Sequence, residues 1–425
     1  MFRKSIVWAV GGGIIFAILL LLLGWFLFVR GQNSEIEKNL EGRGFGTNIP
    51  VFEGEGFGST NQNIKDALLS GFGLFTNSSN EQNDEGAEKI LPRLWNPSSI
   101  PSAGISIMGV ATSTKIQFVE RPSGNVFEAN LTEGNVNRIS NTLIPNVYQA
   151  FWGGEGVLVM QHLDENGDIA TFLGSIIKPT ASSTENAIGT FSGSYLEPDI
   201  TSVSTDMESK KIFYIVKTIN GAVGITTGGK ENDSKRIFTS RTSGWRSNIL
   251  NPDAILLFQN ASEAVEGSAF VLDGKGNRTL IKNNVRGLII TISPDEKSLL
   301  YNNIVSDRIT LLSQSEGSVE REVPLSTFAE KCVFSPQDSS IAYCAVPRGI
   351  PDEPMPDAWY RGEVHFSDDW WIVNLENGSV EQLISPESEY KVTIDVINPQ
   401  INEDGTHIVF LDAYTRTPWV LRILQ

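Results

Sequence analysis

A short hydrophobic pattern recurs along this chain and restricts the folds that are open to it. Each copy follows a predicted turn and consists of Ile or Leu, one residue of any kind, and then an aromatic residue or Met. Because side chains two apart on a strand point to the same face, each copy predicts a buried pair on an inner strand of a sheet. The pairs are Ile116 with Phe118, Leu158 with Met160, Ile212 with Tyr214, Leu256 with Phe258, Leu299 with Tyr301, Ile341 with Tyr343, and Ile408 with Phe410. Most successive pairs are 42 to 44 residues apart, which is the period of a four-stranded propeller blade.

The clearest copies belong to a larger repeating unit. Residues 287–303, GLIITISPDEKSLLYNN, and residues 330–346, EKCVFSPQDSSIAYCAV, have the pattern of a strand, a Ser-Pro-acid turn and a second strand. Residues 392–413 repeat the unit with a longer turn. Proline presets the backbone of the turn and ends the hydrogen-bond ladder there. A third and a fourth strand follow as a hairpin, most clearly around the turn Glu376–Gly378.

These units resemble the blades of TolB-like and WD-repeat-like β-propellers, in which a Ser-Pro-Asp-Gly-type turn precedes an Ile-x-Phe or Ile-x-Tyr strand. The resemblance covers about residues 89–425 and implies an all-β fold, a seven-bladed β-propeller. It also implies a binding platform, although propellers serve unrelated systems and the fold names no ligand. The glycine of the family's turn is absent from SPDEKS and SPQDSS, and the turns near residues 112, 154 and 207 lack the motif.

The two ends of the repeat region predict how the ring closes. Seven innermost strands are expected, near residues 104, 147, 199, 244, 287, 330 and 392. The last blade has candidate strands for only three of its four positions. The segment KILPRLWNP, residues 89–97, has no partner of its own and is similar to the fourth strand of the sixth blade. We expect it to supply the missing outer strand and so to remove an exposed sheet edge. An isolated extended arm is the alternative.

The first thirty residues contain a candidate membrane anchor. Ile6 to Val29 form an uncharged apolar run, which as a helix would span about 36 Å, enough to cross a bilayer. Its length, and the polar residues that directly follow it, favour an uncleaved anchor over a cleaved signal peptide. Arg3 and Lys4 precede it and acidic residues follow soon after, which predicts a cytoplasmic amino terminus. Residues 1–30 are therefore expected to be a cytoplasmic tip and a single transmembrane helix at the cell membrane, with the rest of the chain extracytoplasmic.

A linker is expected between the anchor and the propeller. Residues 31–88 are rich in Gly, Asn, Ser and Glu, a composition that cannot bury a core, so we expect a flexible, disordered linker. As a coil it would span about 40 Å and hold the propeller off the membrane. Ile64, Leu68, Leu69 and Phe75 fall near helical spacing, which leaves open a short amphipathic helix for a partner or the membrane surface.

Charge and motif content exclude several functions. The net charge of −17 and the pI near 4.7 argue against a nucleic-acid partner, since phosphate binding requires clustered basic residues. The chain has no P-loop, no Rossmann fingerprint and no Gly-x-Ser-x-Gly elbow. Its three histidines, His162, His365 and His407, lack metal-ligand spacing. Residues 164–168, DENGD, resemble part of a calcium loop but favour a hairpin turn. The sequence therefore predicts no cofactor, no metal site and no enzyme.

A long insertion in the sixth blade contains the candidate binding residues. The second strand of that blade ends near Val346 and the third begins near Asp369, and the intervening segment is far longer than a usual turn. Tyr, Trp and Arg carry much of the binding energy at protein interfaces, and loops on a rigid scaffold often recognise partners. The candidates are Trp359, Tyr360, Arg361, His365 and Phe366. The alternative is that these aromatic residues fold down to plug the central channel or to cover the rim.

A second long excursion, residues 178–198, is interpreted as a blade-to-blade loop. In a propeller the loops from strand two to strand three and the loops between blades emerge on one face. The two long segments are therefore expected to share a face, and the opposite face is expected to carry mostly tight turns.

The two cysteines lie on the two strands of one predicted hairpin. Cys332 and Cys344 are symmetric about the SPQDSS turn. Outside the cytoplasm this arrangement permits a cross-strand disulfide. Two buried free thiols would also pack well, and adjacent-strand disulfides are often strained, so the sequence leaves both states open.

Together these features predict a membrane-anchored, extracytoplasmic protein-binding or scaffold module of the cell envelope. Its expected partner is another envelope or secreted protein. A propeller enzyme or a glycan-binding protein at the channel mouth is the alternative, and a pure spacer is a third. The acids that such an enzyme would have near the insertion are Asp352, Asp357, Glu363, Asp368 and Asp369.

Overall fold

The structure is a computed structural model, and it describes residues 91–423 apart from 110–112, 178–187, 229–232 and 307. Its strands form seven sheets, and each sheet contains four antiparallel strands. The first three blades are β2 (Ser102–Met108), β3 (Lys115–Glu120), β4 (Val126–Asn130) and β5 (Val136–Arg138); β6 (Val147–Trp152), β7 (Val157–Leu163), β8 (Ile169–Ile177) and β9 (Thr190–Tyr195); and β10 (Ile200–Thr205), β11 (Ile212–Thr218), β12 (Gly221–Thr227) and β13 (Lys235–Ser240).

The remaining four blades follow the same order along the chain. They are β14 (Trp245–Asn251), β15 (Ala254–Gln259), β16 (Glu266–Asp273) and β17 (Arg278–Arg286); β18 (Ile290–Ile292), β19 (Ser298–Val305), β20 (Arg308–Ser315) and β21 (Arg321–Val323); β22 (Cys332–Phe334), β23 (Ile341–Pro347), β24 (Asp368–Asn374) and β25 (Val380–Ile384); and β26 (Val396–Ile401), β27 (His407–Asp412), β28 (Pro418–Arg422) and β1 (Leu94–Trp95). Short helical turns are η2 (Gly154–Gly156), η3 (Ala329–Lys331), α3 (Asp357–Tyr360) and η4 (Pro386–Tyr390).

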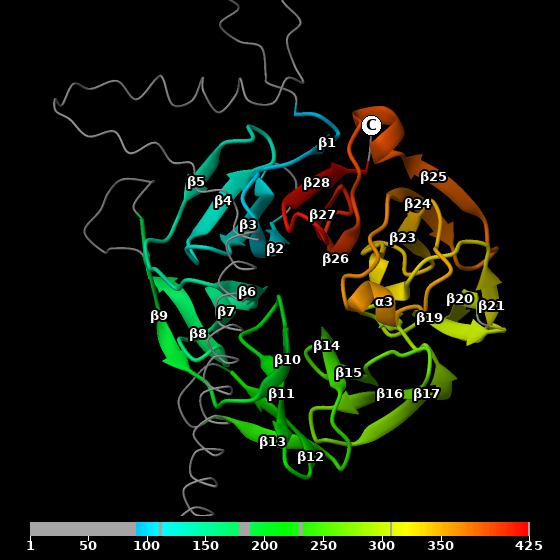
Figure 1. Ribbon diagram of the computed structural model, residues 1–425, viewed down its shortest axis with the longest axis horizontal. Coiled ribbons are helices and arrows are strands. Elements are labelled where there is room, and N and C mark those ends of the chain that lie inside the picture. Colours follow the sequence, from blue (N-terminus) through cyan, green and yellow to red (C-terminus); the bar gives the residue numbers. More distant parts are fainter. Residues whose placement is uncertain (1–90, 110–112, 178–187, 229–232, 307, 424–425) are drawn as a thin grey trace, which may run out of the picture. The chain divides into compact units, whose positions relative to one another are not determined.

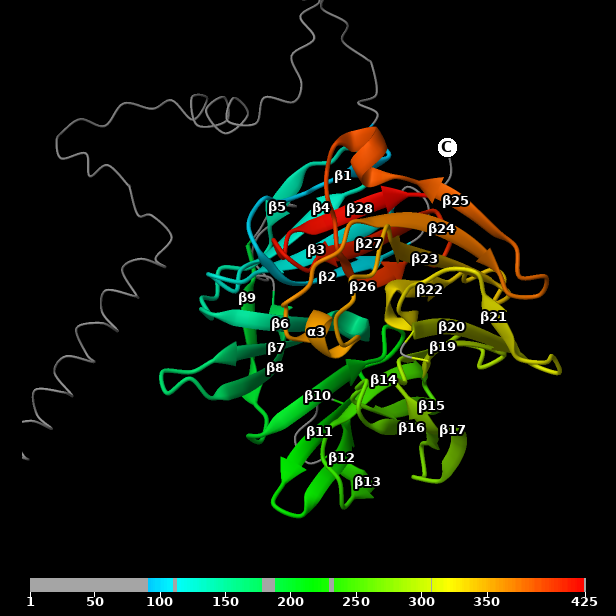
Figure 2. The ribbon, with the colours of Figure 1, turned by 45° about the vertical axis from the view of Figure 1, so that its right-hand side comes forward.

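The seven sheets surround a common centre. Figure 1 shows β2, β6, β10, β14 and β26 next to it, and the turned view of Figure 2 shows the same order of strands outward from it. Each sheet packs face to face with its neighbours, so a strand in the middle of a blade is buried on both sides. The prediction of an all-β, seven-bladed propeller is confirmed.

The recurring hydrophobic pairs all lie on the second strand of their blades. On β11 the four successive residues Ile212 to Ile215 are buried, because neighbouring blades cover both faces of that strand. The recurring pair therefore marks only one face of this strand, and the neighbouring apolar residues occupy its other face. In blades five and six the pairs begin at Leu299 and Ile341, which are only half buried.

The ring closes through the first strand of the described chain. β1 pairs with β28 in antiparallel register, with Leu94 opposite Leu421 and Trp95 opposite Val420. The guanidinium group of Arg93 donates to the carbonyl oxygens of Arg422 at 3.1 Å and Ile423 at 3.0 Å. The predicted closure is confirmed, although the paired strand is only two residues long. Lys89 and Ile90 of the predicted segment lie outside the described residues.

The prediction that residues 178–198 form a blade-to-blade loop is wrong. They include β9, the fourth strand of blade two, which pairs with β8 along its whole length. β8 therefore ends, and β9 begins, on the face opposite the insertion, so the two long segments do not share a face; residues 178–187 themselves lie outside the described residues. The small residues of this strand gave no strand signal in the sequence. At Gly193 a small residue is required, because a Cβ atom there would lie 1.9 Å from the carbonyl oxygen of Leu173, so only glycine permits this approach. The strand lacks apolar alternation because most of its side chains face solvent at the rim.

The two faces of the ring differ in what they carry. We call the face with the insertion the insertion face; it carries the loops from second to third strands and the connections between blades. Since β1 runs antiparallel to β28, the chain enters β1 on the opposite face and leaves it on the insertion face. Leu91 accordingly lies against Gly134 in the turn between β4 and β5, which belongs to the opposite face. Leu91, the first residue that the structure describes, therefore lies on the side of the propeller away from the insertion.

The predicted anchor, residues 1–30, and linker, residues 31–88, lie outside the described residues. Among the helices that the structure does describe, none has the length and apolar character needed to span a bilayer.

The hairpin of β22 and β23 contains a disulfide. Cys332 lies directly opposite Cys344 in the ladder, and their sulfur atoms are bonded. Both residues are buried in the core that blade six shares with blade five. Of the two states that the sequence leaves open, the structure has the bonded one.

Replacing both cysteines by alanine is expected to lower the free energy of unfolding. The bond closes a loop with a sequence separation of 12 residues, for which chain entropy gives a contribution of about 2–3 kcal/mol. The measurement is thermal unfolding of wild type and of the Cys332→Ala, Cys344→Ala variant, each with and without a phosphine reductant. The chain has only these two cysteines, so the reductant should lower the wild-type midpoint and leave the variant unchanged. An unchanged wild-type midpoint would mean that the bond does not stabilise the fold.

Candidate functional site

The insertion of blade six is an ordered segment, which we call the strap. It comprises residues 348–367, between β23 and β24, and contains α3. In Figure 1, α3 lies nearer the centre of the ring than β24 and β25. The helix ends at Tyr360, and Gly362, two residues later, has φ +71°. The N–H of Gly362 donates to the Trp359 carbonyl, and the N–H of Glu363 donates to the Ala358 carbonyl. This pair of bonds is the Schellman arrangement, which favours glycine in the left-handed position.

The underside of the strap is packed into the protein. Trp359 is 8% exposed and Phe366 is 4% exposed. The Trp359 ring stacks on Phe328 with 4.9 Å between ring centroids, and the Phe366 ring is tilted against both. For these two candidate residues the structure matches the alternative in which the aromatic side chains fold down. They anchor the strap and do not present a surface.

A buried lysine lies beneath the two rings. Lys331, at the end of η3, has its Nζ 4.8 Å from the centre of the Trp359 ring and 4.9 Å from that of Phe366. The same nitrogen lies 2.6 Å from Asp368 Oδ2 and 2.6 Å from Asp395 Oδ1. All three charged side chains are at most 1% exposed. We call these five residues the clasp.

The clasp joins three parts of the ring. Lys331 precedes the first strand of blade six, Asp368 begins β24 where the strap ends, and Asp395 precedes the first strand of blade seven. The indole N–H of Trp359 donates to the Asp395 carboxylate at 3.0 Å, and the backbone N–H of Phe366 donates to the same group at 3.1 Å. Buried charges are stable only when paired and hydrogen-bonded, so this network fixes the strap to its neighbours.

Of the clasp charges, the sequence analysis named Asp368 alone, as one acid among several near the insertion. Lys331 and Asp395 were missed. Their only signal is a charged residue placed directly before an apolar innermost strand, in AEKCVF and TIDVIN. Neither segment reveals that the two charges meet.

The exposed side of the strap carries Tyr360. The residue is 40% exposed, but its hydroxyl group donates to Glu330 and accepts from the Arg246 guanidinium at 3.4 Å. Arg246 also forms an ion pair with Glu330 at 3.1 Å. Although part of the side chain is exposed, desolvation of its hydroxyl group between Arg246 and Glu330, and then the negative charge of Glu330, hold the pKa of Tyr360 well above its usual value. Its phenol therefore stays protonated, which disfavours a role as a nucleophile and suits a polar contact.

Two further candidate residues are exposed on the strap. Arg361 forms a bidentate ion pair with Glu363, at 2.7 and 2.8 Å. The His365 side chain is 38% exposed and lies 3.6 Å from the Asp395 carboxylate. Its ring packs edge-on against Tyr414, which is 74% exposed. Tyr414 lies in the loop between β27 and β28, so it adds a residue of blade seven to the same face; the sequence analysis did not identify it.

The acids named for an alternative enzymatic function are mostly engaged in bonds within the protein. Asp357 accepts from the backbone N–H of Glu263, and Asp369 binds Arg348. Glu363 is held by Arg361, and Asp368 is buried against Lys331. The remaining acid, Asp352, is exposed.

Among the described residues no group of three or more His, Cys, Asp or Glu side chains is placed to hold a metal ion. The 164–168 segment forms a turn in which the Asp164 carboxylate accepts from backbone N–H groups of the same turn.

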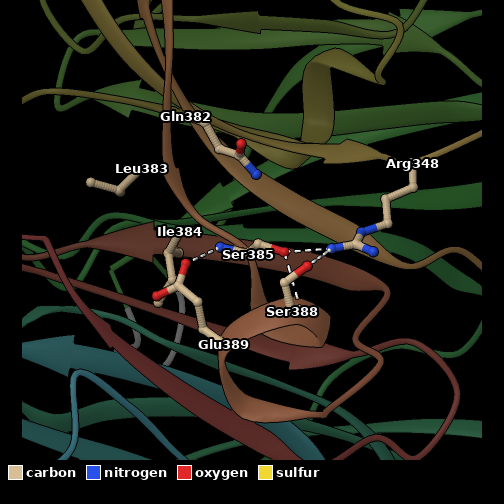
Figure 3. A pocket seen from close by; sticks show the side chains of 7 residues that line it. All are labelled: Arg348, Gln382, Leu383, Ile384, Ser385, Ser388 and Glu389. Atoms are coloured by element: carbon tan, nitrogen blue, oxygen red, sulfur yellow. Dashed lines mark hydrogen bonds between the residues drawn. The ribbon is translucent and has the colours of Figure 1, made fainter.

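A shallow polar hollow lies beside the start of the strap, between Arg348 and η4. Its volume is about 310 Å³, and Figure 3 shows the residues that line it. Arg348 occupies one side and donates to the hydroxyl groups of Ser385 and Ser388. The same guanidinium also contacts the carboxylates of Asp369 and Glu387. The arginine is thus already neutralised within the protein, and the hollow has no uncompensated positive charge to offer an anion.

Comparisons with known proteins show only a general likeness. No family model matches the chain, and no curated protein matches its sequence. The WD40 domain of Neurospora crassa Pan2 is 11% identical over 78% of this chain and 96% of that domain, with a TM-score of 0.47. A streptogramin B lyase is 11% identical over 78% and 97% of the two chains, with a TM-score of 0.48. TolB from Acinetobacter baumannii is 11% identical over 75% and 79%, with a TM-score of 0.38. Likeness at this level carries no information about ligands or activity.

Proposed function

We propose that this chain is a membrane-anchored, extracytoplasmic scaffold whose propeller binds another protein of the cell envelope, or a secreted protein, through the insertion face. The fold supplies a rigid platform, and the apolar run Ile6 to Val29 is suited to be the anchor. Residues 31–88 have the composition of a tether between the two.

The observation that carries the proposal is the two-sided construction of the strap. Its underside is fixed by the clasp, so the exposed side needs little ordering when a partner binds, and preorganised surfaces lose less entropy on association. That side displays Tyr360, Arg361 and His365, and Tyr414 continues the surface onto blade seven. Tyrosine and arginine are enriched among the residues that dominate binding energy.

The direction of the chain supports this choice of face. The described chain enters β1 from the opposite face, where Leu91, its first described residue, lies against Gly134. A propeller held through that segment has its insertion face clear of the point of attachment.

The disulfide supports an extracytoplasmic location. Disulfides persist in oxidising compartments and are rare where glutathione and thioredoxin keep thiols reduced. The bond between Cys332 and Cys344 lies in the blade that carries the strap. The same compartment is implied by the charge pattern around the predicted anchor.

Binding is favoured over catalysis by the state of the acidic residues. The two buried carboxylates, Asp368 and Asp395, share one ammonium group and have no contact with solvent. A hydrolytic pair needs carboxylates that reach a substrate across a pocket. The proposed function therefore requires no catalytic residue.

Photo-crosslinking in membranes tests the proposal. The full-length chain is expected to stay in the membrane fraction after carbonate washing. A photoreactive amino acid at position 360 or 414 is expected to form an adduct with one and the same protein. Position 319 is the control: Val319 is 81% exposed but lies in the turn between β20 and β21, on the opposite face. Adducts at position 319 should be several-fold weaker.

Substitutions complete the same experiment. Tyr360→Ala with Tyr414→Ala is expected to reduce capture of that protein several-fold, whereas Val319→Ala should leave it unchanged. Equal adducts from both faces would contradict the assignment of the face. The spacer alternative predicts that neither face yields a specific adduct.

A further inference from the structure

The charges of the clasp do not balance. One ammonium group, on Lys331, faces two carboxylates, on Asp368 and Asp395, and all three are excluded from water. With both acids ionised the buried cluster has a net charge of −1. A buried uncompensated charge is unfavourable in a low-dielectric interior, so the cluster favours any change that removes it.

The charged groups around the clasp offer one other means of compensation. On the strap, His365 Nδ1 lies 3.6 Å from Asp395 Oδ2. On η3, Glu330 is engaged by Arg246, and on β24, Asp369 is engaged by Arg348. From blade seven, the Asp412 carboxylate accepts from the backbone N–H of Asp395 and from Thr415. His365 is the only imidazole among these groups, and it lies beside the Asp395 carboxylate.

One carboxylate oxygen of the clasp is unpartnered within the described structure. Asp368 Oδ2 accepts from Lys331 and from the backbone N–H of Val396 at 2.8 Å. Asp368 Oδ1 is buried and has no hydrogen-bond partner. Asp395, by contrast, accepts from Lys331, Trp359 and Phe366. Of the two acids, Asp368 therefore loses fewer hydrogen bonds if it becomes neutral.

We propose that protonation of the clasp stabilises the closed position of the strap. As the pH falls below neutrality, the clasp takes up one proton from solvent on Asp368 Oδ1 and becomes neutral overall. The neutral clasp then holds the strap more tightly. Lys331 then remains paired with the Asp395 carboxylate, and Asp368 Oδ2 continues to accept from Lys331 and Val396. The partner-binding surface is thereby more firmly positioned in mildly acidic surroundings than at neutral pH.

The sign of this pH dependence follows from whether the proton binds more tightly when the strap is closed or when it is open. Burial raises the pKa of Asp368 to about 6 in the closed protein; Lys331 opposes this rise, and Asp395 adds to it. An opened strap exposes Asp368 to water, where its pKa returns to the ordinary value of 3.8. The closed state therefore binds the proton more tightly, and the stabilisation of the closed strap by this proton is lost as the pH rises through about 6. Between pH 7.5 and pH 5 the opening equilibrium is expected to fall by about tenfold.

Hydrogen exchange of the full-length protein measures this equilibrium. The backbone N–H groups of Phe366 and Val396 donate directly to the clasp carboxylates and serve as reporters. After correction for the intrinsic pH dependence of exchange, their protection should increase by about tenfold from pH 7.5 to pH 5. Amides of β11, which lies in blade three, serve as the reference. Protection that is constant or decreases toward acid would overturn the proposal.

Two matched variants identify the proton's site. Asp368→Asn removes the excess charge permanently, so its reporters should be as protected at pH 7.5 as wild type is at pH 5, with no further change. His365→Gln should keep the tenfold response; if it abolishes the response, the proton binds His365 and the proposal fails. An independent readout is the infrared carbonyl stretch of a protonated carboxylic acid, expected in wild type below about pH 6. Its absence in folded wild type would overturn the assignment even if Asp368→Asn does not fold. These outcomes do not depend on whether a partner protein exists.

Discussion

Replacing Lys331 by methionine is expected to destabilise the propeller by about 3–5 kcal/mol at neutral pH, the range observed when one partner of a buried ion pair is removed. Methionine approximates the length of the lysine side chain but leaves Asp368 and Asp395 without a positive charge. The loss in free energy of unfolding should be smaller at pH 5, because protonating Asp368 removes one of the two negative charges that the substitution leaves unpaired. Urea unfolding at pH 7.5 and at pH 5 measures both effects.

A matched surface substitution separates the clasp from the general loss of a lysine. The side chain of Lys297 is 62% exposed and forms an ion pair with Asp295 at 3.4 Å, so Lys297→Met should change the free energy of unfolding by less than about 1 kcal/mol. Equal penalties for the two substitutions would show that the clasp does not stabilise the fold.

Chemical rescue provides a second test of the same site. Lys331→Ala leaves the two carboxylates and the faces of Trp359 and Phe366 around an empty volume. Propylammonium chloride is expected to raise the unfolding midpoint of this variant more than an equal concentration of potassium chloride does. Wild type should show no such difference. A variant that responds equally to both salts would contradict a role for the ammonium group itself.

Replacing Leu94 by aspartate is expected to open the ring, and its cost should match or exceed the 2–5 kcal/mol typical of truncating a buried leucine to alanine. Leu94 is 3% exposed and packs in the core that contains Phe410 and Leu421. The substitution places a carboxylate in that core and disrupts a strand only two residues long. The outer edge of β28 would then be unpaired, which favours association between chains.

Leu143→Asp is the control, since Leu143 is 69% exposed and its substitution should cost less than about 0.5 kcal/mol. Thermal unfolding gives the stabilities, and hydrogen exchange of β28 reports on the edge directly. If Leu94→Asp and Leu143→Asp are equally stable, closure by β1 contributes little and the last blade is held by its other three strands.

The blades and their closure were predictable because their signals are local or periodic. The recurring pairs lie two residues apart on one strand, and each copy repeats the surroundings of the previous one. β1 was predictable because three candidate strands in blade seven implied a fourth. β9 was not, because its Thr, Ser and Gly residues reflect an exposed rim and a close backbone approach between Gly193 and β8. Composition alone does not distinguish such a strand from a loop.

The sequence analysis placed the candidate binding residues in the insertion of blade six, but it did not separate the buried side of that segment from the exposed side. Trp359 and Tyr360 are neighbours in the sequence, and one is buried while the other is 40% exposed. On a single helical turn, adjacent side chains point in different directions, so residue type cannot tell which of them faces solvent.

The sequence by itself determined the seven-bladed architecture and showed that the first extended segment completes the last blade, but it did not reveal β9, the fourth strand of blade two. Only the tertiary structure decided what the insertion does with its aromatic residues. Lys331 is separated from Asp368 by 37 residues and from Asp395 by 64, and the three meet only when blades six and seven pack together. Periodicity records which faces of a strand are apolar. The pairing of buried charges depends on the positions of whole blades, which no local pattern contains.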